Sequence, residues 1–221
     1  MAEKYITLNI PQSYGDISLK KWLELQKEME NYSDNEEAVN ALILYHLCGL
    51  PVEDASKIDI KSYQEIIYEL NQFLNKTDLS LIRFVTIDGK EYGFEPNLSN
   101  MSYGSFVDVT AFETFTIDKN WPKIMNILYR EVESKVGDTY TIKPYVAKDD
   151  WEKWMSVGMD VHLGALFFFV HLSQDLMSSI LKSTMETELP HNFNSILERN
   201  GKVMLQYMNS PMEILQNTGK Y

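Results

Sequence analysis

The feature that most constrains the fold is a change of hydrophobic period in the middle of the chain. Residues 81–96, LIRFVTIDGKEYGFEP, alternate around Asp88-Gly89, a dipeptide typical of two-residue hairpin turns. We therefore predict a β-hairpin with a return strand at 90–94 and one face made by Ile82, Phe84 and Thr86. A lone hairpin is only marginally stable in water, so it must pack on helices or pair with another strand.

Two segments are candidates for that further strand. Residues 139–145, TYTIKPY, are rich in β-forming side chains. Residues 4–10, KYITLNI, have the same character, and we predict a short N-terminal strand there that stops at Pro11.

Three amphipathic helices are predicted before the hairpin. The first follows a cap at Asp16 or Ser18, and the second follows a cap at Ser33 or Asp34. The third comes after a short helical turn that starts at Pro51. Its buried stripe is predicted to contain Ile60, Tyr63, Ile66, Ile67, Leu70 and Phe73 or Leu74.

Two shorter helices are predicted directly after the hairpin. Ser102 begins the first. The second covers residues 118–133, DKNWPKIMNILYREVE, with Asp118 or Asn120 as its cap and Pro122 in its first turn.

The C-terminal part of the chain is predicted to be helical. Residues 148–189 are too many for one uninterrupted helix, and Gly158 and Gly164 are the expected places for a break or a close helix contact. A last helix is predicted at 192–209.

These elements predict an α+β fold that is mainly α, a helical bundle with an inserted β-hairpin or short sheet. The sequence has no Gly/Ser-rich or Pro-rich linker and no internal repeat, so residues 1–221 are expected to form a single α-rich unit. Its subdivision would be an N-terminal strand and helical bundle at 1–78, the hairpin and short helices at 79–146, and long C-terminal helices at 147–221.

Charge and hydropathy argue against two classes of partner. With 20 Lys+Arg and 32 Asp+Glu, the net charge is −12, which disfavours the counterion release that drives nucleic-acid binding. The most apolar stretch, VHLGALFFFVHL at 161–172, is much shorter than the roughly 20 apolar residues of a membrane span. We predict no direct sequence-specific nucleic-acid binding, no membrane crossing, and a buried helix at 161–172.

The sequence offers no recognisable catalytic or cofactor motif. Its four histidines are scattered, and the sole cysteine, Cys48, lies in the apolar segment ILYHLCGLP. His162 and His171 are interpreted as core or interface residues. Neither a nucleophile elbow nor a phosphate-binding glycine loop occurs. We therefore predict no enzyme activity, no cofactor and no metal site.

Aromatic residues are the most prominent candidates for contacts with other proteins, because tyrosine and tryptophan combine an apolar body with a polar tip. Most are expected to be in the core. Those in loops or at element ends, with their neighbours in the middle of the chain, are the candidate interface residues: Tyr92, Phe94, Pro96, Tyr103, Trp121, Tyr129, Arg130, Trp151 and Trp154.

Four short motifs follow one another in the second half of the chain: YGFEPNLSNMSYGSFVDV at 92–109, IMNILYREV at 124–132, YTIKPY at 140–145 and GALFFFVHL at 164–172. Their succession resembles a family of small virion-associated proteins in crAss-like tailed phages that infect Bacteroidetes. The chain departs from the family pattern at Glu131, where a proline commonly follows the Tyr-Arg pair. The matching positions are Tyr92, Gly93, Pro96, Leu98, Gly104, Val107, Asp108, Tyr129, Arg130, Tyr140, Ile142, Pro144 and Tyr145.

The resemblance implies a non-enzymatic virion structural protein. Members of this family look like ring or connector proteins at the portal and head-tail junction, or like tail-assembly proteins. It therefore implies a homo-oligomeric ring that contacts portal or neighbouring tail proteins, without a cofactor, in a virion assembled in the host cytoplasm. The hairpin and its aromatic loop would then be an assembly surface, with Gly93 and Gly104 permitting tight turns.

Two alternatives to the ring protein stay open at this point. The first is a tail assembly chaperone that is absent from the mature virion, since an acidic, helix-rich chain suits both functions. The second is an enzyme that uses Cys48 or a histidine. The sequence does not separate the ring protein from the chaperone.

Overall fold

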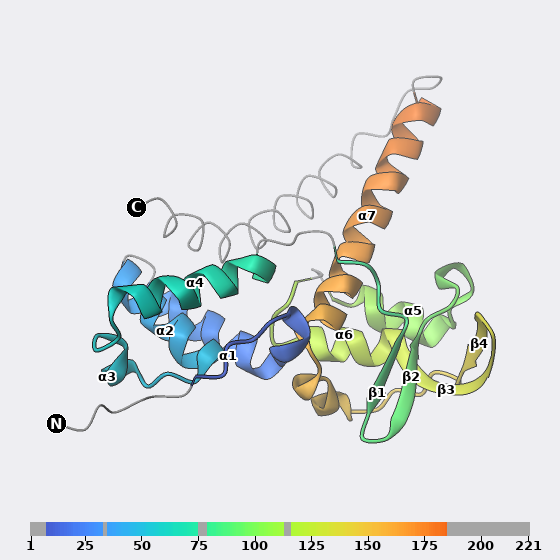
Figure 1. The fold of residues 1–221 in the computed structure, drawn as a ribbon. Helices are drawn as coiled ribbons and strands as arrows, with labels where there is room; N and C mark the ends of the chain where they lie inside the picture. The colour runs from blue at the N-terminus through green and yellow to red at the C-terminus, as the bar shows by residue number, and fades with distance from the viewer. Residues whose placement is uncertain (1–7, 33–34, 75–78, 113–115, 185–221) are drawn as a thin grey trace.

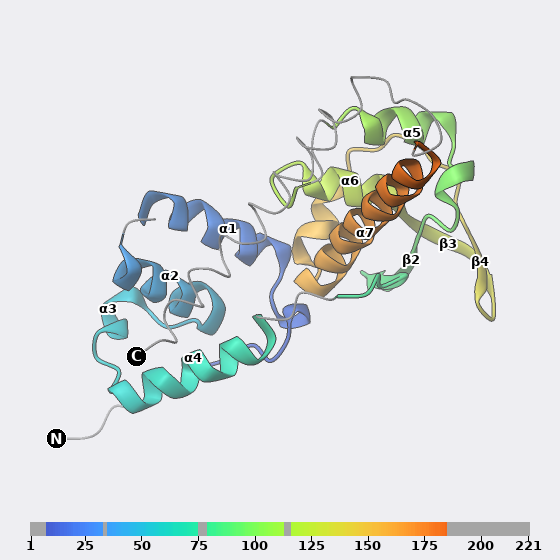
Figure 2. The same cartoon turned by 90° about the horizontal axis from the view of Figure 1, so that it is seen from above.

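The computed structural model describes residues 8–32, 35–74, 79–112 and 116–184. Helices α1 to α4 gather in one half of the molecule, and a four-stranded sheet with α5 and α6 forms the other half (Figures 1 and 2). Helix α7 rises from the junction between the halves (Figure 1). The predicted fold class, mainly α with a small β element, is confirmed.

The N-terminal half contains the predicted helices. Helix α1 spans Leu19–Met29, with Ser18 as its cap, and α2 spans Glu36–Cys48. The cap of α2 is Asn35, whose side chain accepts a hydrogen bond from the Ala38 amide at 3.0 Å. This corrects the predicted caps Ser33 and Asp34, which lie outside the described residues.

Helices α3 and α4 complete this half and span Val52–Ala55 and Ile60–Leu74. The predicted stripe on α4 is confirmed at Ile66, Ile67, Leu70, Phe73 and Leu74, which are buried. It is wrong at Ile60, because the first residue of the helix follows an exposed turn and is itself exposed.

The predicted hairpin is confirmed. Strand β1 spans Phe84–Ile87 and β2 spans Lys90–Phe94, and the turn residues Asp88 and Gly89 have φ of 50° and 75°. Positive φ at both positions is the geometry of a type I′ turn, which Asp-Gly favours. Within β1, Val85 and Ile87 point to the core, and Phe84 and Thr86 share the other face as predicted. Ile82, the third residue predicted for that face, lies before the strand and packs against the core.

The strand that pairs with the hairpin comes from an unexpected segment. Helix α6 spans only Trp121–Leu128, and the chain continues as β3, Tyr129–Val136, antiparallel to β2. Strand β4, Thr139–Ile142, then pairs with β3, which gives the order β1-β2-β3-β4. The helix predicted at 118–133 is therefore correct only in its first half, because the residues from Tyr129 onward pair with the edge of β2 as a strand.

The other predicted partner strand is not found. Residues 8–10 of the predicted N-terminal strand at 4–10 form no strand, and the residues before them lie outside the described part. The segment at 139–145 does join the sheet, although its partner is β3 and not the hairpin.

Helix α5 spans Tyr103–Thr110 with Ser102 as its cap, as predicted, and α7 spans Met159–Thr184. Helix α7 begins directly after Gly158, whereas Gly164 lies inside it. A Cβ atom at Gly164 would lie 2.5 Å from the Ser80 carbonyl oxygen, so this glycine permits a close contact and not a break. The helix predicted at 192–209 lies outside the described residues.

Short 3-10 helices connect these elements at Tyr14–Asp16, Glu30–Tyr32, Leu98–Asn100 and Trp151–Ser156, labelled η1 to η4. The two halves are joined where η1 meets the start of α7. The Leu19 amide donates to the Val157 carbonyl at 3.0 Å, and the Met159 amide donates to the Ile17 carbonyl at 2.8 Å. One buried cluster draws residues from all three predicted segments of the chain. No helix among the described residues has both the length and the apolar character to cross a membrane.

Candidate functional site

Several of the predicted interface aromatics are core residues. Trp121, Trp154, Phe94 and Tyr129 are buried. The Phe94 ring packs against Tyr129 and against Phe168 of α7, and the Tyr129 ring packs against Trp154. Their position at element ends suggested exposure, but these ends meet in the middle of the molecule. Their assignment to an interface is therefore corrected, since a partner cannot reach them in this fold.

The remaining predicted residues differ in their exposure. Tyr92 and Trp151 are half-buried, whereas Pro96 and Tyr103 are exposed. The Arg130 guanidinium forms an ion pair with Glu95, and both side chains are largely shielded from solvent. An ion pair of this kind holds β3 to the end of β2, so Arg130 is engaged within the chain.

A buried polar network lies behind these aromatics. The Trp121 indole N–H donates to Nδ1 of His162 at 3.1 Å, and Nε2 of His162 lies 3.1 Å from the Trp154 carbonyl oxygen. Because an indole only donates, the His162 proton must be on Nε2. Burial lowers the pKa of His162 to about 4. His162 is therefore a neutral core residue, as one of the predicted alternatives had it, whereas His171 is exposed.

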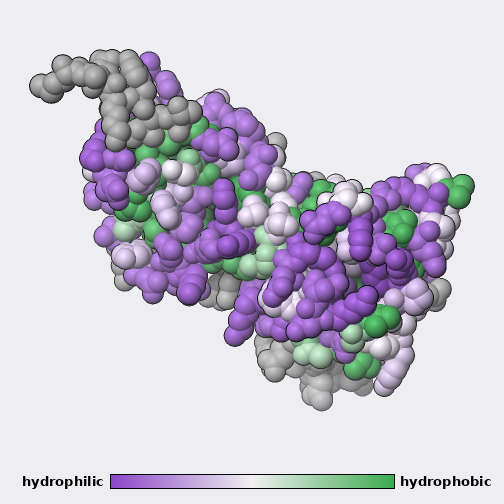
Figure 3. All heavy atoms as spheres, turned by 90° about the horizontal axis from the view of Figure 1, so that it is seen from below, coloured by the Kyte–Doolittle hydropathy of each residue, from purple (hydrophilic) through white to green (hydrophobic). Residues whose placement is uncertain are grey.

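The surface residues that do come together lie on helix α5. Tyr103, Phe106 and Val107 are 83%, 53% and 42% exposed. Their spacing of three and four residues places them on one face of the helix. Figure 3 shows that hydrophilic side chains cover most of the face it presents, with apolar side chains in separate patches. Exposed apolar residues gathered on one helix face are typical of a protein-binding surface. We call these three residues the α5 face.

The opposite side of α5 is fixed to the sheet half of the molecule. Ser105 and Val109 are buried, and the Tyr145 hydroxyl donates to the Asp108 carboxylate. The Tyr145 ring lies against Gly104, where a Cβ atom would be 3.5 Å away. Burial, followed by the hydrogen bond to Asp108, raises the pKa of Tyr145 to about 12. The α5 face is therefore held in place by a residue that follows β4.

Neither glycine of the aromatic segment makes the tight turn that was expected. Gly93 lies in β2 and Gly104 in α5, and neither has a positive φ. At Gly93 a Cβ atom would lie 2.9 Å from the Tyr140 ring, and the Tyr140 hydroxyl donates to the Phe94 carbonyl at 2.6 Å. Gly93 thus leaves room for a tyrosine that spans two strands.

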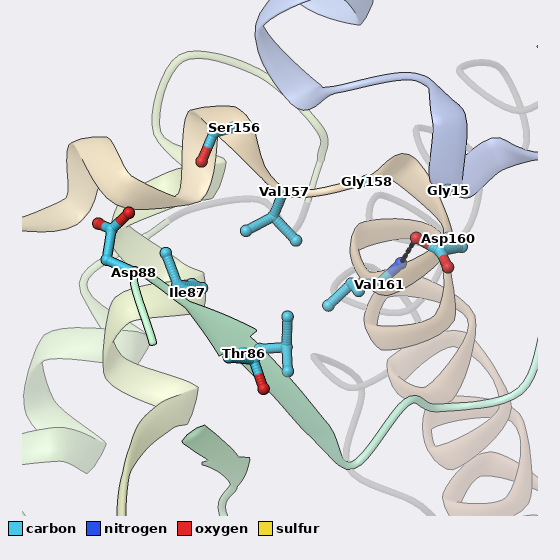
Figure 4. A pocket seen from close by; sticks show the side chains of 10 residues that line it. Gly15, Thr86, Ile87, Asp88, Ser156, Val157, Gly158, Asp160 and Val161 are labelled. Carbon is cyan, nitrogen blue, oxygen red and sulfur yellow. Dashed lines mark hydrogen bonds between the residues drawn. The ribbon is translucent and has the colours of Figure 1, made fainter. Parts of the chain in front are cut away.

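A hollow of about 310 Å³ lies between β1 and the start of α7 (Figure 4). Val157 and Val161 form an apolar wall, while Asp88 and Asp160 lie on opposite sides of it (Figure 4). The Asp160 carboxylate accepts a hydrogen bond from the Val161 amide at 2.9 Å. The lining has no paired acid and base and no nucleophile beside a base, so it does not resemble a catalytic site.

The described residues contain no group of three or more His, Cys, Asp or Glu side chains that could hold a metal ion. Cys48 is buried, and burial raises the pKa of its thiol to about 11. A thiol with so high a pKa is a poor nucleophile near neutral pH.

The sequence prediction included Tyr103 but omitted its neighbours Phe106 and Val107 from the interface. The signal that could have found them is the spacing of apolar residues on a helix of eight residues. The buried side of this helix consists of Ser105 and Val109, so the apolar residues at its other positions must face outward.

Comparison with protein-family models, with curated proteins and with solved structures finds no match for this chain.

Proposed function

We propose that this protein is a non-enzymatic assembly protein that binds another protein through the α5 face. The observation that carries the proposal is the exposure of Tyr103, Phe106 and Val107 on a helix whose other side is fixed by Tyr145. A rigid apolar surface loses little conformational entropy when a partner covers it, and tyrosine and phenylalanine are frequent anchors of interfaces.

The resemblance described above supplies the biological setting of the proposal. In that setting the chain is one copy of a ring at the portal or head-tail junction of a tailed phage, and the partner is a portal or neighbouring tail protein. A net charge of −12 suits such a place, because a negatively charged ring repels DNA that passes it. The first of the two alternatives is a tail assembly chaperone that leaves before the virion is complete.

The α5 face is tested by replacing its most exposed aromatic residues. The test uses a phage whose own copy of the gene is deleted. In it we expect the double variant Tyr103→Ser, Phe106→Ser to be incorporated into particles about tenfold less than the wild type. A reduction of this size is expected when one or two anchoring side chains of an interface are lost. Quantitative mass spectrometry of gradient-purified particles measures this. Because both side chains are exposed, the free energy of unfolding should change little.

A matched control is available on the sheet. Val136 is 82% exposed but lies at the end of β3, away from α5, so Val136→Ser should enter particles like the wild type. If the α5 variant enters particles normally, the α5 face is not the assembly surface. If the wild-type chain is abundant in lysates but missing from purified particles, the ring proposal is wrong and the assembly chaperone is favoured.

A further inference from the structure

Among the described residues, one edge of strand β1 has no partner strand, and we call it the free edge. Strand β1 is the first strand in the order β1-β2-β3-β4, and β2 pairs with its other side. Hydrogen-bonded and non-hydrogen-bonded pairs alternate along an antiparallel ladder. Ile87 faces Lys90 across the two-residue turn, and the Phe94 amide donates to the Arg83 carbonyl at 2.8 Å, which fixes the phase. The amides and carbonyls of Phe84 and Thr86 therefore point away from β2.

Thr86, one of these two residues, also lines the hollow between β1 and α7. Four consecutive residues, 85–88, line one side of the hollow, and the apolar side chains of Val157 and Val161 line the other (Figure 4). Unpaired backbone donors and acceptors opposite an apolar wall are what an added strand requires, since its backbone pairs with the edge and its side chains contact the wall. A free edge that is left open is also a hazard for aggregation.

We propose that residues 1–7 of a second copy of this chain add to the free edge of β1 as a fifth strand. The segment, MAEKYIT, ends in Tyr5, Ile6 and Thr7, which are all strongly β-forming. Its charges, Glu3 and Lys4, cancel, so it adds no net repulsion against Asp88 and Asp160 of the hollow. The proposal extends, and rests on, the multi-copy assembly in the proposed function.

The donor is a second copy because the chain after this segment is held on the side of the N-terminal helices. The described chain begins at residue 8, darkest blue in Figure 1, beside these helices, and it reaches the hollow only at Gly15. Seven extended residues span roughly 23 Å, which is enough to reach a neighbouring subunit. Each copy then donates at one place and accepts at another, and such head-to-tail contacts can close into a ring.

The test uses variants that block each side of the contact. Thr86→Pro removes a backbone N–H that forms no hydrogen bond with β2. It places at the free edge a proline ring, which cannot donate a hydrogen bond to an added strand. Thr86→Val keeps the amide and is its matched control. Deletion of residues 1–7 removes the donor segment and none of the described residues. Analytical ultracentrifugation of each otherwise full-length chain, over a range of concentrations, gives the size of the assembly.

We expect the wild type and Thr86→Val to self-associate and both blocked variants to remain monomers. A mixture of the two blocked variants should form one-to-one pairs and nothing larger, because Thr86→Pro still donates and the shortened chain still accepts. A monomeric wild type, unchanged assembly in either blocked variant, or a mixture without pairs overturns the inference. None of these outcomes bears on the α5 face, because its variants are tested by their incorporation into particles. The α5 variants should self-associate like the wild type.

Discussion

At the scale of single residues, the fold depends on polar atoms that are buried together with aromatic rings. Trp121, His162 and Trp154 come from α6, α7 and η4, and their hydrogen bonds connect these elements inside the core. The Trp154 indole in turn donates to the Asn126 side chain at 3.2 Å. A buried imidazole with both nitrogens satisfied costs little, whereas a protonated one would place a second donor against the Trp121 N–H.

The first prediction concerns the effect of acid on this residue. Burial lowers the pKa of His162 to about 4, whereas the pKa is about 6.5 in the unfolded chain. Between these pH values the unfolded state binds a proton that the folded state does not, so stability must fall as the pH falls from 6.5 to 4. The free energy of unfolding should drop by roughly 3 kcal/mol over this range because of His162 alone.

Urea unfolding at a series of pH values measures this drop. His162→Gln keeps a donor and an acceptor but does not titrate, so its stability should depend less on pH over the same range. His171→Gln changes an exposed histidine of the same helix and should follow the wild type. Parallel pH curves for the wild type and His162→Gln would contradict the prediction.

At the scale of elements, the sequence predicted those that carry local signals. Asp88-Gly89 marked the hairpin, and Ser18 and Ser102 marked the starts of α1 and α5. Strand β3 was missed because residues 129–133 continue an amphipathic helical pattern, and only the free edge of β2 makes them a strand. Likewise, no local pattern shows that Trp121 and Trp154 meet in the core. Such outcomes depend on tertiary contacts, which override local propensity.

The second prediction concerns how α5 is held. Tyr145→Phe removes the hydroxyl that donates to Asp108 but keeps the ring against Gly104. Losing a hydrogen bond to a charged group should cost about 1.5–3 kcal/mol, and amides of α5 should exchange faster with solvent. Hydrogen exchange followed by mass spectrometry resolves this helix. Tyr103→Phe, which removes the hydroxyl of an exposed tyrosine on α5, should leave the exchange unchanged.

At the scale of the whole molecule, a narrow junction joins the two halves. Gly158 pairs with Ser18 across it, and its backbone lies directly against Gly15. The core is continuous through this point, since buried residues of α1 and α7 belong to one cluster. The junction therefore determines whether the halves unfold together.

The third prediction tests this junction. A Cβ atom at Gly158 would lie 2.7 Å from the Gly15 carbonyl oxygen and 2.6 Å from the Asp160 carboxylate. Because backbone cannot move aside as a flexible side chain can, Gly158→Ala should cost about 1–3 kcal/mol. Calorimetry should show a broader or divided transition as the halves separate. Gly104→Ala, where the nearest atom would be 3.5 Å away, should keep a single transition near the wild-type temperature.

The buried thiol of Cys48 reports how often the N-terminal half of the molecule opens. It is the only cysteine, it is buried in α2, and its pKa is raised to about 11, so a thiol reagent reacts with it only while the N-terminal helices are open. The rate of thiol modification at low denaturant concentration therefore measures how often the N-terminal half opens. A spectroscopic signal of the whole chain, such as circular dichroism, measures global unfolding under the same conditions. Comparing the two rates shows whether the two halves open together or one before the other.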